Sequence, residues 1–246
     1  MVQPWRTGKV IRILDETSST RRFWIEVPEL ESFDFKPGQF VTLDLPIHEK
    51  PNKRWRSYSI ASWPDGTNVF ELLIVLLEGG AGTTYLFNHI QVGSELTLRG
   101  PQGVFTLPEP VDRDLFFICT GTGIAPFRSM AHHIFLNNVP HQNIYLIFGC
   151  RLLCDSLYNA EMKEMEGKIN SFRYIPTYSR ENDAEGLRKG YVHAVYEEIC
   201  REQSTNGELK PAYFYLCGWK AMIDEAKQRI QALGYDRKSI HQELYG

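Results

Sequence analysis

Two short stretches of this 246-residue chain combine residue types that bind phosphate esters and aromatic rings. The first is the tetrad Arg56, Ser57, Tyr58 and Ser59, which gathers a cation, a phenol and two hydroxyls in an expected strand. An arginine suits a pyrophosphate, a tyrosine packs on an aromatic ring, and a serine hydroxyl can hydrogen-bond a redox-active ring nitrogen. Alternate side chains of a strand point to opposite faces, so a curved sheet edge must bring these groups to one ligand. The tetrad alone also fits an exposed strand with ordinary polar side chains.

The second stretch follows a compact apolar run, Leu115–Cys119, and opens an expected helix. Its residues are Gly121, Thr122, Gly123, Ile124, Ala125 and Pro126. The glycines allow a tight turn, and the N-terminus of the following helix directs free N–H groups and a positive dipole end at a pyrophosphate. The spacing differs from the G-x-G-x-x-G of the Rossmann fingerprint, so a Rossmann dehydrogenase is not favoured. The alternative is a glycine-rich turn between strand and helix that binds nothing.

A third loop is also rich in glycine and precedes a short expected helix. It consists of Gly79, Gly80, Ala81, Gly82, Thr83 and Thr84. Its glycines permit close backbone approach, and the two threonines offer hydroxyls and amides to a phosphate. The alternative is a flexible exit from a hairpin.

Composition and charge exclude several classes of protein. Hydrophobic residues make up 43% and charged residues 23% of the chain, as in ordinary globular proteins. The net charge of −3, from 30 acidic and 27 basic residues, gives no field that would attract nucleic acid. The start, Met1–Arg6, lacks the apolar run of a secretory signal, and no apolar stretch is long enough to cross a bilayer. We therefore expect a cytoplasmic protein without membrane insertion or a nucleic-acid partner.

The five cysteines indicate neither a disulfide framework nor a metal site. Their number is odd, and no C-x-x-C pair occurs. No nearby ligand pair completes a zinc or iron–sulfur pattern around the two closest of them, so we expect thiols and no metal. They are Cys119, Cys150, Cys154, Cys200 and Cys217.

Short strands separated by turn residues dominate the chain up to about residue 108. Gly38–Leu45 alternates most clearly and predicts a half-buried strand. Many strands with spaced turns favour a small antiparallel barrel. The expected strands are Lys9–Leu14, Arg22–Val27, Gly38–Leu45, Val69–Leu77 and Glu95–Leu98.

Beyond the Pro108–Pro110 stretch the pattern changes to apolar runs alternating with helix-length segments. Ile144–Phe148 and Ala212–Cys217 repeat the run seen at Leu115–Cys119. A helix is expected over Lys220–Leu233, with Gly234 as its C-terminal cap. Alternating strands and helices require a mostly parallel sheet. The sequence thus predicts a β-barrel domain over residues 1–110 and an α/β domain over residues 111–246.

Over nearly its whole length the chain resembles the plant-type ferredoxin–NADP(H) reductases, a family of FAD-dependent oxidoreductases. The tetrad matches the family's R-x-Y-S flavin motif, and Gly80–Thr83 matches its G-x-x-[ST] motif. The resemblance implies that Arg56 binds the FAD pyrophosphate, Tyr58 packs against the isoalloxazine, and Ser59 lies near the nitrogen that accepts hydride. It also implies that Thr83, assisted by Thr84, binds phosphate.

The same resemblance identifies residues for NADP(H). The family has a G-T-G-I-A-P turn for the pyrophosphate and an S-R pair that contacts the extra phosphate of NADPH, here Ser179 and Arg180. A hydroxyl and a fixed cation suit that phosphate, so NADPH is favoured over NADH. Arg188, Lys189 and Tyr191 are expected to complete the pocket. For these three the alternative is an exposed loop with solvated charges.

The family's nicotinamide site resembles Cys217-Gly218 and the C-terminal segment of this chain. The resemblance implies that Cys217 positions the ring without acting as a nucleophile, that Glu243 joins the active-site hydrogen bonds, and that Tyr245 stacks on the flavin. Trp219 departs from the family's proline or asparagine, and Gly246 extends one residue beyond the usual aromatic end. The alternatives are a structural cysteine and a tyrosine packed in the core.

The resemblance implies hydride exchange between NADP(H) and FAD and single-electron exchange with ferredoxin or flavodoxin, in a direction that the motifs leave open. A second reading is the reductase component of an oxygenase, which the absence of a fused iron–sulfur domain disfavours in its self-contained form. A third is a non-catalytic nucleotide-binding docking module, which gives Ser59, Cys217 and Glu243 no shared purpose. Basic residues near the flavin motif, including Lys50 and Lys53, suit an acidic carrier.

Overall fold

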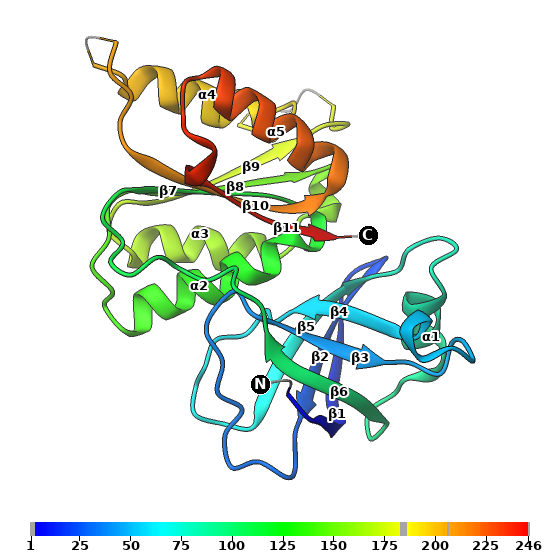
Figure 1. Cartoon of the computed structure of the whole chain (residues 1–246). Coiled ribbons are helices and arrows are strands. Elements are labelled where there is room, and N and C mark those ends of the chain that lie inside the picture. The colour runs from blue at the N-terminus through cyan, green and yellow to red at the C-terminus, as the bar shows by residue number, and fades with distance from the viewer. Residues whose placement is uncertain (1–2, 183–185, 206, 246) are drawn as a thin grey trace. The chain divides into compact units, whose positions relative to one another are not determined.

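The computed structural model describes residues 3–182, 186–205 and 207–245 (Figure 1). Contacts divide the chain into two compact units. Unit 1 comprises Met1–Thr106 with Ala125–His133, and unit 2 comprises Leu107–Ile124 with Ile134–Gly246. The predicted domain boundary at residues 110 and 111 stays a prediction, and part of one helix groups with unit 1.

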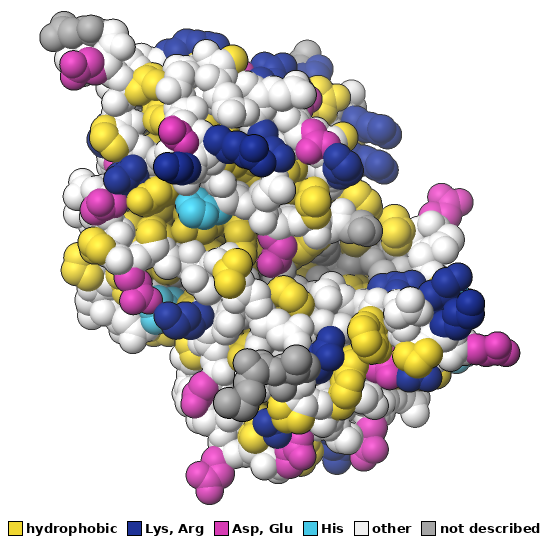
Figure 2. Space-filling view, viewed as in Figure 1, with side chains coloured by type: hydrophobic (Ala, Val, Ile, Leu, Met, Phe, Trp, Pro, Cys, Tyr) yellow, Lys and Arg dark blue, Asp and Glu magenta, His cyan; other side chains and the backbone are white. Residues whose placement is uncertain are grey.

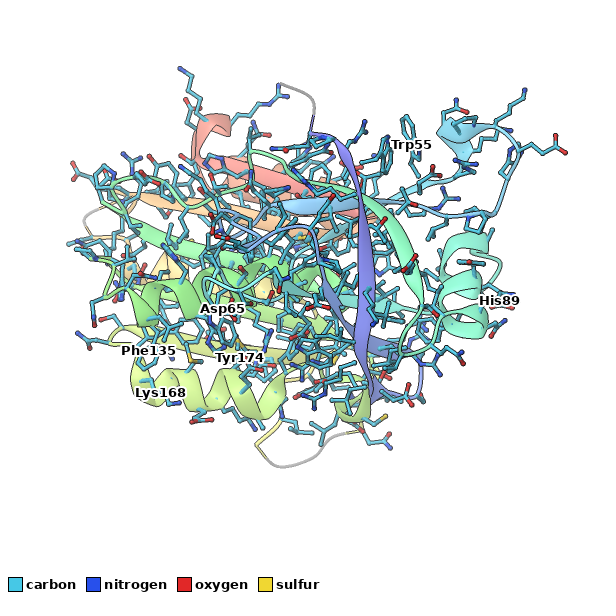
Figure 3. All side chains as sticks on the ribbon, turned by 90° about the horizontal axis from the view of Figure 1, so that it is seen from below. Trp55, Asp65, His89, Phe135, Lys168 and Tyr174 are labelled. Carbon is cyan, nitrogen blue, oxygen red and sulfur yellow. The ribbon has the colours of Figure 1, made fainter. Side chains whose placement is uncertain are left out.

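Unit 1 is built on a six-stranded antiparallel sheet in the order β4-β3-β6-β1-β2-β5. An isolated bridge between Ile60 and Leu72 joins the end of β4 to β5, the two outermost strands, and so rolls the sheet toward a barrel. One helix, α1 (Ala81–His89), begins within the glycine-rich segment Gly79–Thr84. Figure 3 labels Trp55 and His89, the first residue of β4 and the last of α1. The strands are β1 (Trp5–Thr17), β2 (Thr20–Glu26), β3 (Phe40–Asp44), β4 (Trp55–Ser59), β5 (Val69–Val75) and β6 (Glu95–Gln102).

The core of unit 1 consists of aliphatic and aromatic side chains on the inner faces of these strands. Val41 and Leu43 are fully buried, as their alternation predicts. Thr42 is buried as well, although it lies on the opposite face of β3, because its hydroxyl lies 3.0 Å from that of Ser57 on β4. β3 is therefore more buried than a half-exposed strand.

Unit 2 contains a five-stranded parallel sheet in the order β11-β10-β7-β8-β9. In Figure 1, α4 and α5 cover one face of this sheet and α3 lies on the other. Phe116, Ile118, Phe214 and Leu216 pack against α4 and α5 in one apolar cluster. The elements are β7 (Asp114–Thr120), β8 (Ile144–Cys150), α3 (Asn159–Lys168), β9 (Phe172–Tyr178), α4 (Val192–Gln203), β10 (Ala212–Trp219), α5 (Lys220–Ala232) and β11 (Ile240–Tyr245).

The apolar runs of the sequence form the central strands of this sheet. All side chains from Leu115 to Cys119 are at most 1% exposed, because both faces of β7 are covered. The helix expected near the C-terminus forms as α5, and Gly234 follows it with φ of +107°. An antiparallel barrel-like sheet followed by a parallel α/β sheet confirms the predicted fold class. Among the described helices, none combines the length and apolar character needed to cross a membrane.

Most of α2, from Ala125 to His133, groups with unit 1, and four short 3-10 helices complete the described part of the structure. They are η1 (Pro51–Lys53), η2 (Gly121–Ile124), η3 (Leu153–Asp155) and η4 (Arg237–Ser239). α2 (Ala125–Leu136) follows η2 directly. Gly246 lies outside the described residues, so the structure does not bear on its effect.

Candidate functional site

The flavin-motif tetrad lies on β4 and at the edge of the unit 1 sheet. Its register with β3 sets Tyr58 opposite Val41 and Arg56 opposite Leu43, on the core side. Ser57 faces the other side and meets Thr42 there. The alternation expected of a strand is thus present, and Ser59 at the end of β4 is 4% exposed.

Arg56 lies directly against the first turn of α1. A Cβ added to Gly82 would come within 2.9 Å of the Arg56 Cγ, so only a glycine allows this approach without moving the arginine. The guanidinium donates to the carbonyls of Trp55, at 2.8 Å, and Lys53, at 3.1 Å. No side chain caps the N-terminus of α1, where Gly80 is the N-cap residue. A cation beside an uncapped helix N-terminus is an arrangement that suits a phosphate, so the assignment of Arg56 to the FAD pyrophosphate stays a prediction with compatible geometry.

Thr83 has a structural role in the same loop. Its hydroxyl accepts the Leu77 N–H at 3.1 Å and donates to the Gly80 carbonyl at 3.1 Å. These bonds fix the loop that leads into α1, while the Thr84 side chain is exposed. Phosphate binding by Thr83 and Thr84 stays a prediction, and the structure shows that the Thr83 hydroxyl already has partners within its own loop.

Tyr58 packs on the core of unit 1 and stays protonated. Burial raises the pKa of its phenol to about 12, against a smaller opposing effect of Arg56. A neutral, well-packed ring can serve as a fixed surface for an aromatic ligand.

The predicted pyrophosphate turn of unit 2 forms η2, between the end of β7 and the start of α2. A Cβ added to Gly123 would lie 2.3 Å from the carbonyl oxygen of Cys217 on β10, so the turn closes on backbone. Gly121 has φ of +53° and open space around it. The turn therefore needs its two glycines for different reasons, and it leads into a helix N-terminus, as phosphate binding requires.

Cys217 and Gly218 lie at the carboxyl end of β10, next to Thr120 at the end of β7. Gly218 has φ of +145°, and a Cβ there would lie 2.5 Å from the Thr120 Oγ1. That hydroxyl is buried without a hydrogen-bond partner among the described residues. A buried, unpaired hydroxyl at this position could accept a hydrogen bond from, or donate one to, a bound nucleotide, and no sequence motif pointed to Thr120.

Cys217 is a buried thiol and not a thiolate. Burial raises its pKa well above the usual value, nearby Glu243 raises it further, and a hydrogen bond with Tyr245 lowers it less. The β10–β11 register sets Cys217 opposite Glu243 and Trp219 opposite Tyr245. The structure thus brings these three predicted catalytic residues together, and protonation of Cys217 excludes a nucleophilic role at neutral pH. The fourth, Ser59, belongs to unit 1.

The predicted site for the extra phosphate lies where β8 and β9 end. The Ser179 N–H donates to the Cys150 carbonyl at 3.0 Å, and the Arg180 N–H donates to the Arg151 carbonyl at 2.9 Å. The two arginines therefore follow neighbouring parallel strands at one sheet edge. Arg151 was absent from the motif analysis, and its signal was its place directly after the apolar run that forms β8.

The segment after the undescribed residues 183–185 returns to the same sheet edge. The Tyr178 N–H donates to the Arg188 carbonyl and its carbonyl accepts the Gly190 N–H, both at 3.0 Å. Arg188 itself is ion-paired with Glu198 on α4. Tyr191, the N-cap residue of α4, is 71% exposed and able to stack on a ligand ring. Backbone contacts thus bring the segments that carry Arg151, Arg180, Arg188 and Lys189 to one sheet edge.

No group of three or more His, Cys, Asp or Glu residues suited to a metal occurs among the residues that the structure describes. All five cysteines are free.

Comparisons with known proteins agree with this arrangement. An oxidoreductase FAD-binding domain family matches residues 7–107, and an oxidoreductase NAD-binding domain family matches residues 117–228. Ferredoxin–NADP reductase B of Sorangium cellulosum is 34% identical over 240 residues, which cover 97% of this chain and 96% of that protein. The glycine betaine monooxygenase reductase subunit of Pseudomonas aeruginosa is 30% identical over 253 residues, which cover 99% of this chain but 66% of the relative.

Solved structures show the same architecture. A ferredoxin NADP+ reductase from Neisseria gonorrhoeae with bound FAD and NADP matches with a TM-score of 0.80 and 26% identity, covering 98% of each chain. An Amycolatopsis cytochrome P450 reductase matches with a TM-score of 0.85 and 27% identity, over 99% of this chain and 71% of the other. The chain thus belongs to the family of FAD- and NAD(P)-binding oxidoreductases that includes the ferredoxin–NADP reductases.

Proposed function

We propose that this chain is a cytoplasmic ferredoxin–NADP(H) reductase of the plant-type branch. It exchanges hydride between NADP(H) and FAD and single electrons with ferredoxin or flavodoxin. The observation that carries the proposal is the 34% identity to a ferredoxin–NADP reductase over 96% of that relative's length. Residues 1–110 form the FAD-binding domain and residues 111–246 the NADP(H)-binding domain in this proposal.

Unit 1 holds FAD through a charged side chain at one place and uncharged side chains at another. Arg56 and the first turn of α1 bind the pyrophosphate, supported by their close approach at Gly82. Tyr58 supplies a neutral ring against the isoalloxazine, and the Ser59 hydroxyl is directed at its reactive nitrogen. Bound FAD takes up two electrons together and releases them one at a time, while the protein aligns and tunes it.

Unit 2 holds NADP(H) along the carboxyl edge of its sheet. The η2 turn and the N-terminus of α2 take the pyrophosphate. Ser179 and Arg180 bind the extra phosphate of NADPH, and their hydrogen bonds to the β8 exit support adding Arg151 to this pair. Two guanidinium groups on one phosphate favour NADPH over NADH.

The nicotinamide ring is positioned by the residues at the ends of β10 and β11. The Cys217 thiol and the Thr120 hydroxyl orient it as uncharged contacts, and Gly218 lets the end of β10 approach Thr120 closely. Glu243 contributes to the active-site hydrogen bonds. By the family resemblance, Tyr245 would cover the flavin and move aside for nicotinamide, and its displacement would then act as a gate.

A second candidate is the reductase component of an oxygenase. It is supported by the glycine betaine monooxygenase reductase subunit and by the electron transfer component of the anthranilate 1,2-dioxygenase of Acinetobacter baylyi, which is 32% identical over 199 residues. The chain spans 66% and 54% of the lengths of these two relatives. Both candidates use the same FAD and nucleotide sites and differ in the protein that receives the electrons.

The electron carrier docks on the basic end of unit 1 in this proposal. Lys50 and Lys53 are exposed next to the flavin strand, and Figure 2 shows Lys and Arg side chains gathered over that end of the unit. Arg54 contributes less charge, because it is paired with Asp44 at 2.5 Å. An acidic carrier complements such a surface.

Anaerobic reduction of the purified holoprotein tests the function. We expect NADPH to bleach the bound flavin faster than NADH does, and the reduced protein to pass electrons to ferredoxin or flavodoxin. Bound flavin that stays oxidised with both nucleotides would contradict the proposal. Electron transfer to an oxygenase component, with none to either carrier, would favour the second candidate.

The carrier surface is tested with the K50A/K53A variant. Carrier reduction should fall about tenfold at low salt, while NADPH-driven reduction of a small dye stays unchanged, because charge complementarity mainly sets the association rate. Equal losses in both assays would instead indicate damage to the FAD site.

A further inference from the structure

A buried carboxylate in unit 1 is shared by two arginines from different elements. Glu71, in the middle of β5, is 2% exposed. Arg22 on β2 donates two hydrogen bonds to it, of 2.7 and 3.1 Å, and Arg128 on α2 donates a third, of 3.1 Å. A buried charge is tolerated only when it is paired and hydrogen-bonded, so both arginines stabilise this carboxylate.

Arg128 also reaches the segment that follows the flavin strand. The Arg128 Nη1 donates to the Ala61 carbonyl at 2.8 Å, and its guanidinium lies 5.2 Å from the centre of the Trp63 ring. One helical turn later, His132 stacks on the same Trp63 ring, with centroids 3.7 Å apart and planes 14° apart. One face of α2 thus holds residues 61–63, immediately after the predicted flavin tetrad.

The rest of this segment is held by backbone bonds. The Ile60 N–H donates to the Gln39 carbonyl at 2.9 Å, and the Ala61 N–H donates to the Glu71 carbonyl at 2.8 Å. The Ser62 hydroxyl accepts the Glu71 N–H at 2.9 Å. Ala61 is fully buried, so loss of the Arg128 donor deprives its carbonyl of a charged partner where water cannot easily replace it.

We propose that Arg128 is a positioning residue for the flavin site. It fixes the Ala61 carbonyl and thereby the exit of β4, which sets the direction of the Ser59 hydroxyl two residues earlier. The same arginine lies on the first turn of the helix that begins after the predicted pyrophosphate turn, so one side chain holds the nucleotide helix and the flavin strand in register within unit 1. The inference rests on the proposed function, because it assumes that FAD lies beside Ser59.

The matched pair R128K and R22K tests this role. Each variant keeps a positive charge beside Glu71 and loses the planar guanidinium, but only R128K disturbs the bond to Ala61. We expect both to lower the midpoint of thermal unfolding of the apoprotein by similar amounts. Only R128K should weaken FAD binding to the apoprotein, by about tenfold, as expected for losing a charged hydrogen bond to a buried carbonyl.

Two further readouts separate positioning from a general loss of stability. In R128K the visible circular dichroism of the bound flavin should change, and its reduction at saturating NADPH should slow about tenfold, because saturation removes any effect on nucleotide affinity and leaves the effect on the flavin site. R22K should match the wild type in both. R128M, which has neither charge nor donor, should show the same changes as R128K or larger ones.

Two results would overturn the role of Arg128. The first is that R128K and R128M keep the FAD affinity and the flavin dichroism of the wild type. The second is that R22K and R128K change FAD affinity and flavin dichroism equally. If R128M does not fold, the two lysine variants still decide. A wild-type protein that binds FAD but is not reduced by NADPH contradicts the proposed function alone, since the comparison of FAD affinities still tests Arg128.

Discussion

The two glycine loops of the molecule serve the same predicted purpose by different means. In unit 1, Gly82 makes room for a side chain, the flexible stem of Arg56. In unit 2, Gly123 makes room for backbone, the carbonyl of Cys217 on a central strand. A side chain can move by rotation about its bonds, whereas a strand held on both sides in a sheet cannot.

The difference teaches that glycine in a phosphate loop can be required either by the ligand or by the fold. Substitution at Gly82 displaces Arg56, the cation proposed to bind the phosphate, while the strands of the unit 1 sheet need not move. Substitution at Gly123 forces the turn away from β10 and disturbs the sheet edge. The first loop is therefore expected to control affinity and the second to control stability as well as affinity.

G123A should have the largest effect. Its Cβ would lie 2.3 Å from a backbone oxygen, so we expect a loss of about 3 kcal/mol in the free energy of unfolding, together with loss of NADP+ binding. Urea denaturation and a difference-spectrum titration measure the two effects. G167A is the control, because that glycine lies in α3 with nothing within 4 Å, and alanine there should stabilise by about 0.5 to 1 kcal/mol. A G123A protein as stable as the wild type would remove the distinction between the loops.

R180A should have the next largest effect, confined to the nucleotide site. Losing a charged hydrogen bond to phosphate costs about 2 kcal/mol, so NADPH should bind about 30-fold more weakly while NADH binding and FAD content stay unchanged. R173A is the matched control. Arg173 is exposed near the start of β9, whereas Arg180 follows the end of that strand. Equal losses for both coenzymes would show that Arg180 does not select NADPH.

The sequence predicted the elements well where pattern and local chemistry agreed. A short apolar run such as Leu115–Cys119 is typical of a strand covered on both faces, and the glycines from Gly121 to Gly123 are typical of a tight turn between strand and helix. The antiparallel and parallel sheets followed from the change in spacing near residue 108.

What the sequence could not predict depends on residues brought together from distant parts of the chain. The unpaired hydroxyl of Thr120 is visible only once Gly218 lies beside it, and Arg151 becomes a candidate only through its bond with Arg180. Thr83 had the right residue type for phosphate, but its hydroxyl closes its own loop. The contact of Arg128 with Ala61 spans 67 residues and leaves no periodic signal.

G82A tests the flavin side of the comparison and should have a smaller effect than G123A. The added Cβ displaces Arg56, so FAD binding should weaken about tenfold, or about 1.4 kcal/mol, while the apoprotein keeps its stability within about 1 kcal/mol because alanine also favours the helix. G79A is the control: that glycine has φ of +72° and open space, so alanine adds backbone strain of about 1 kcal/mol without contacting Arg56. If G82A destabilised the apoprotein as much as G123A does, the flavin loop would be required by the fold after all.

The smallest expected effect is a difference between the two units in how far acid lowers their stability. Two histidines of unit 2, His193 on α4 and His241 on β11, have a lowered pKa, and burial is the main cause for each. Next to His193, Glu225 opposes this shift and Arg229 adds to it. Folding keeps these imidazoles neutral, while the unfolded chain protonates them near the ordinary pKa of about 6.5. The free energy of unfolding therefore falls as the pH drops through that value and below.

We expect the H193Q/H241Q variant to lose less stability than the wild type between about pH 7.5 and about pH 5.5 in urea denaturation. H48Q, which alters an exposed histidine of unit 1, should follow the wild type. Parallel curves for the wild type and the double variant would mean that these histidines do not make unit 2 the more acid-sensitive part of the molecule.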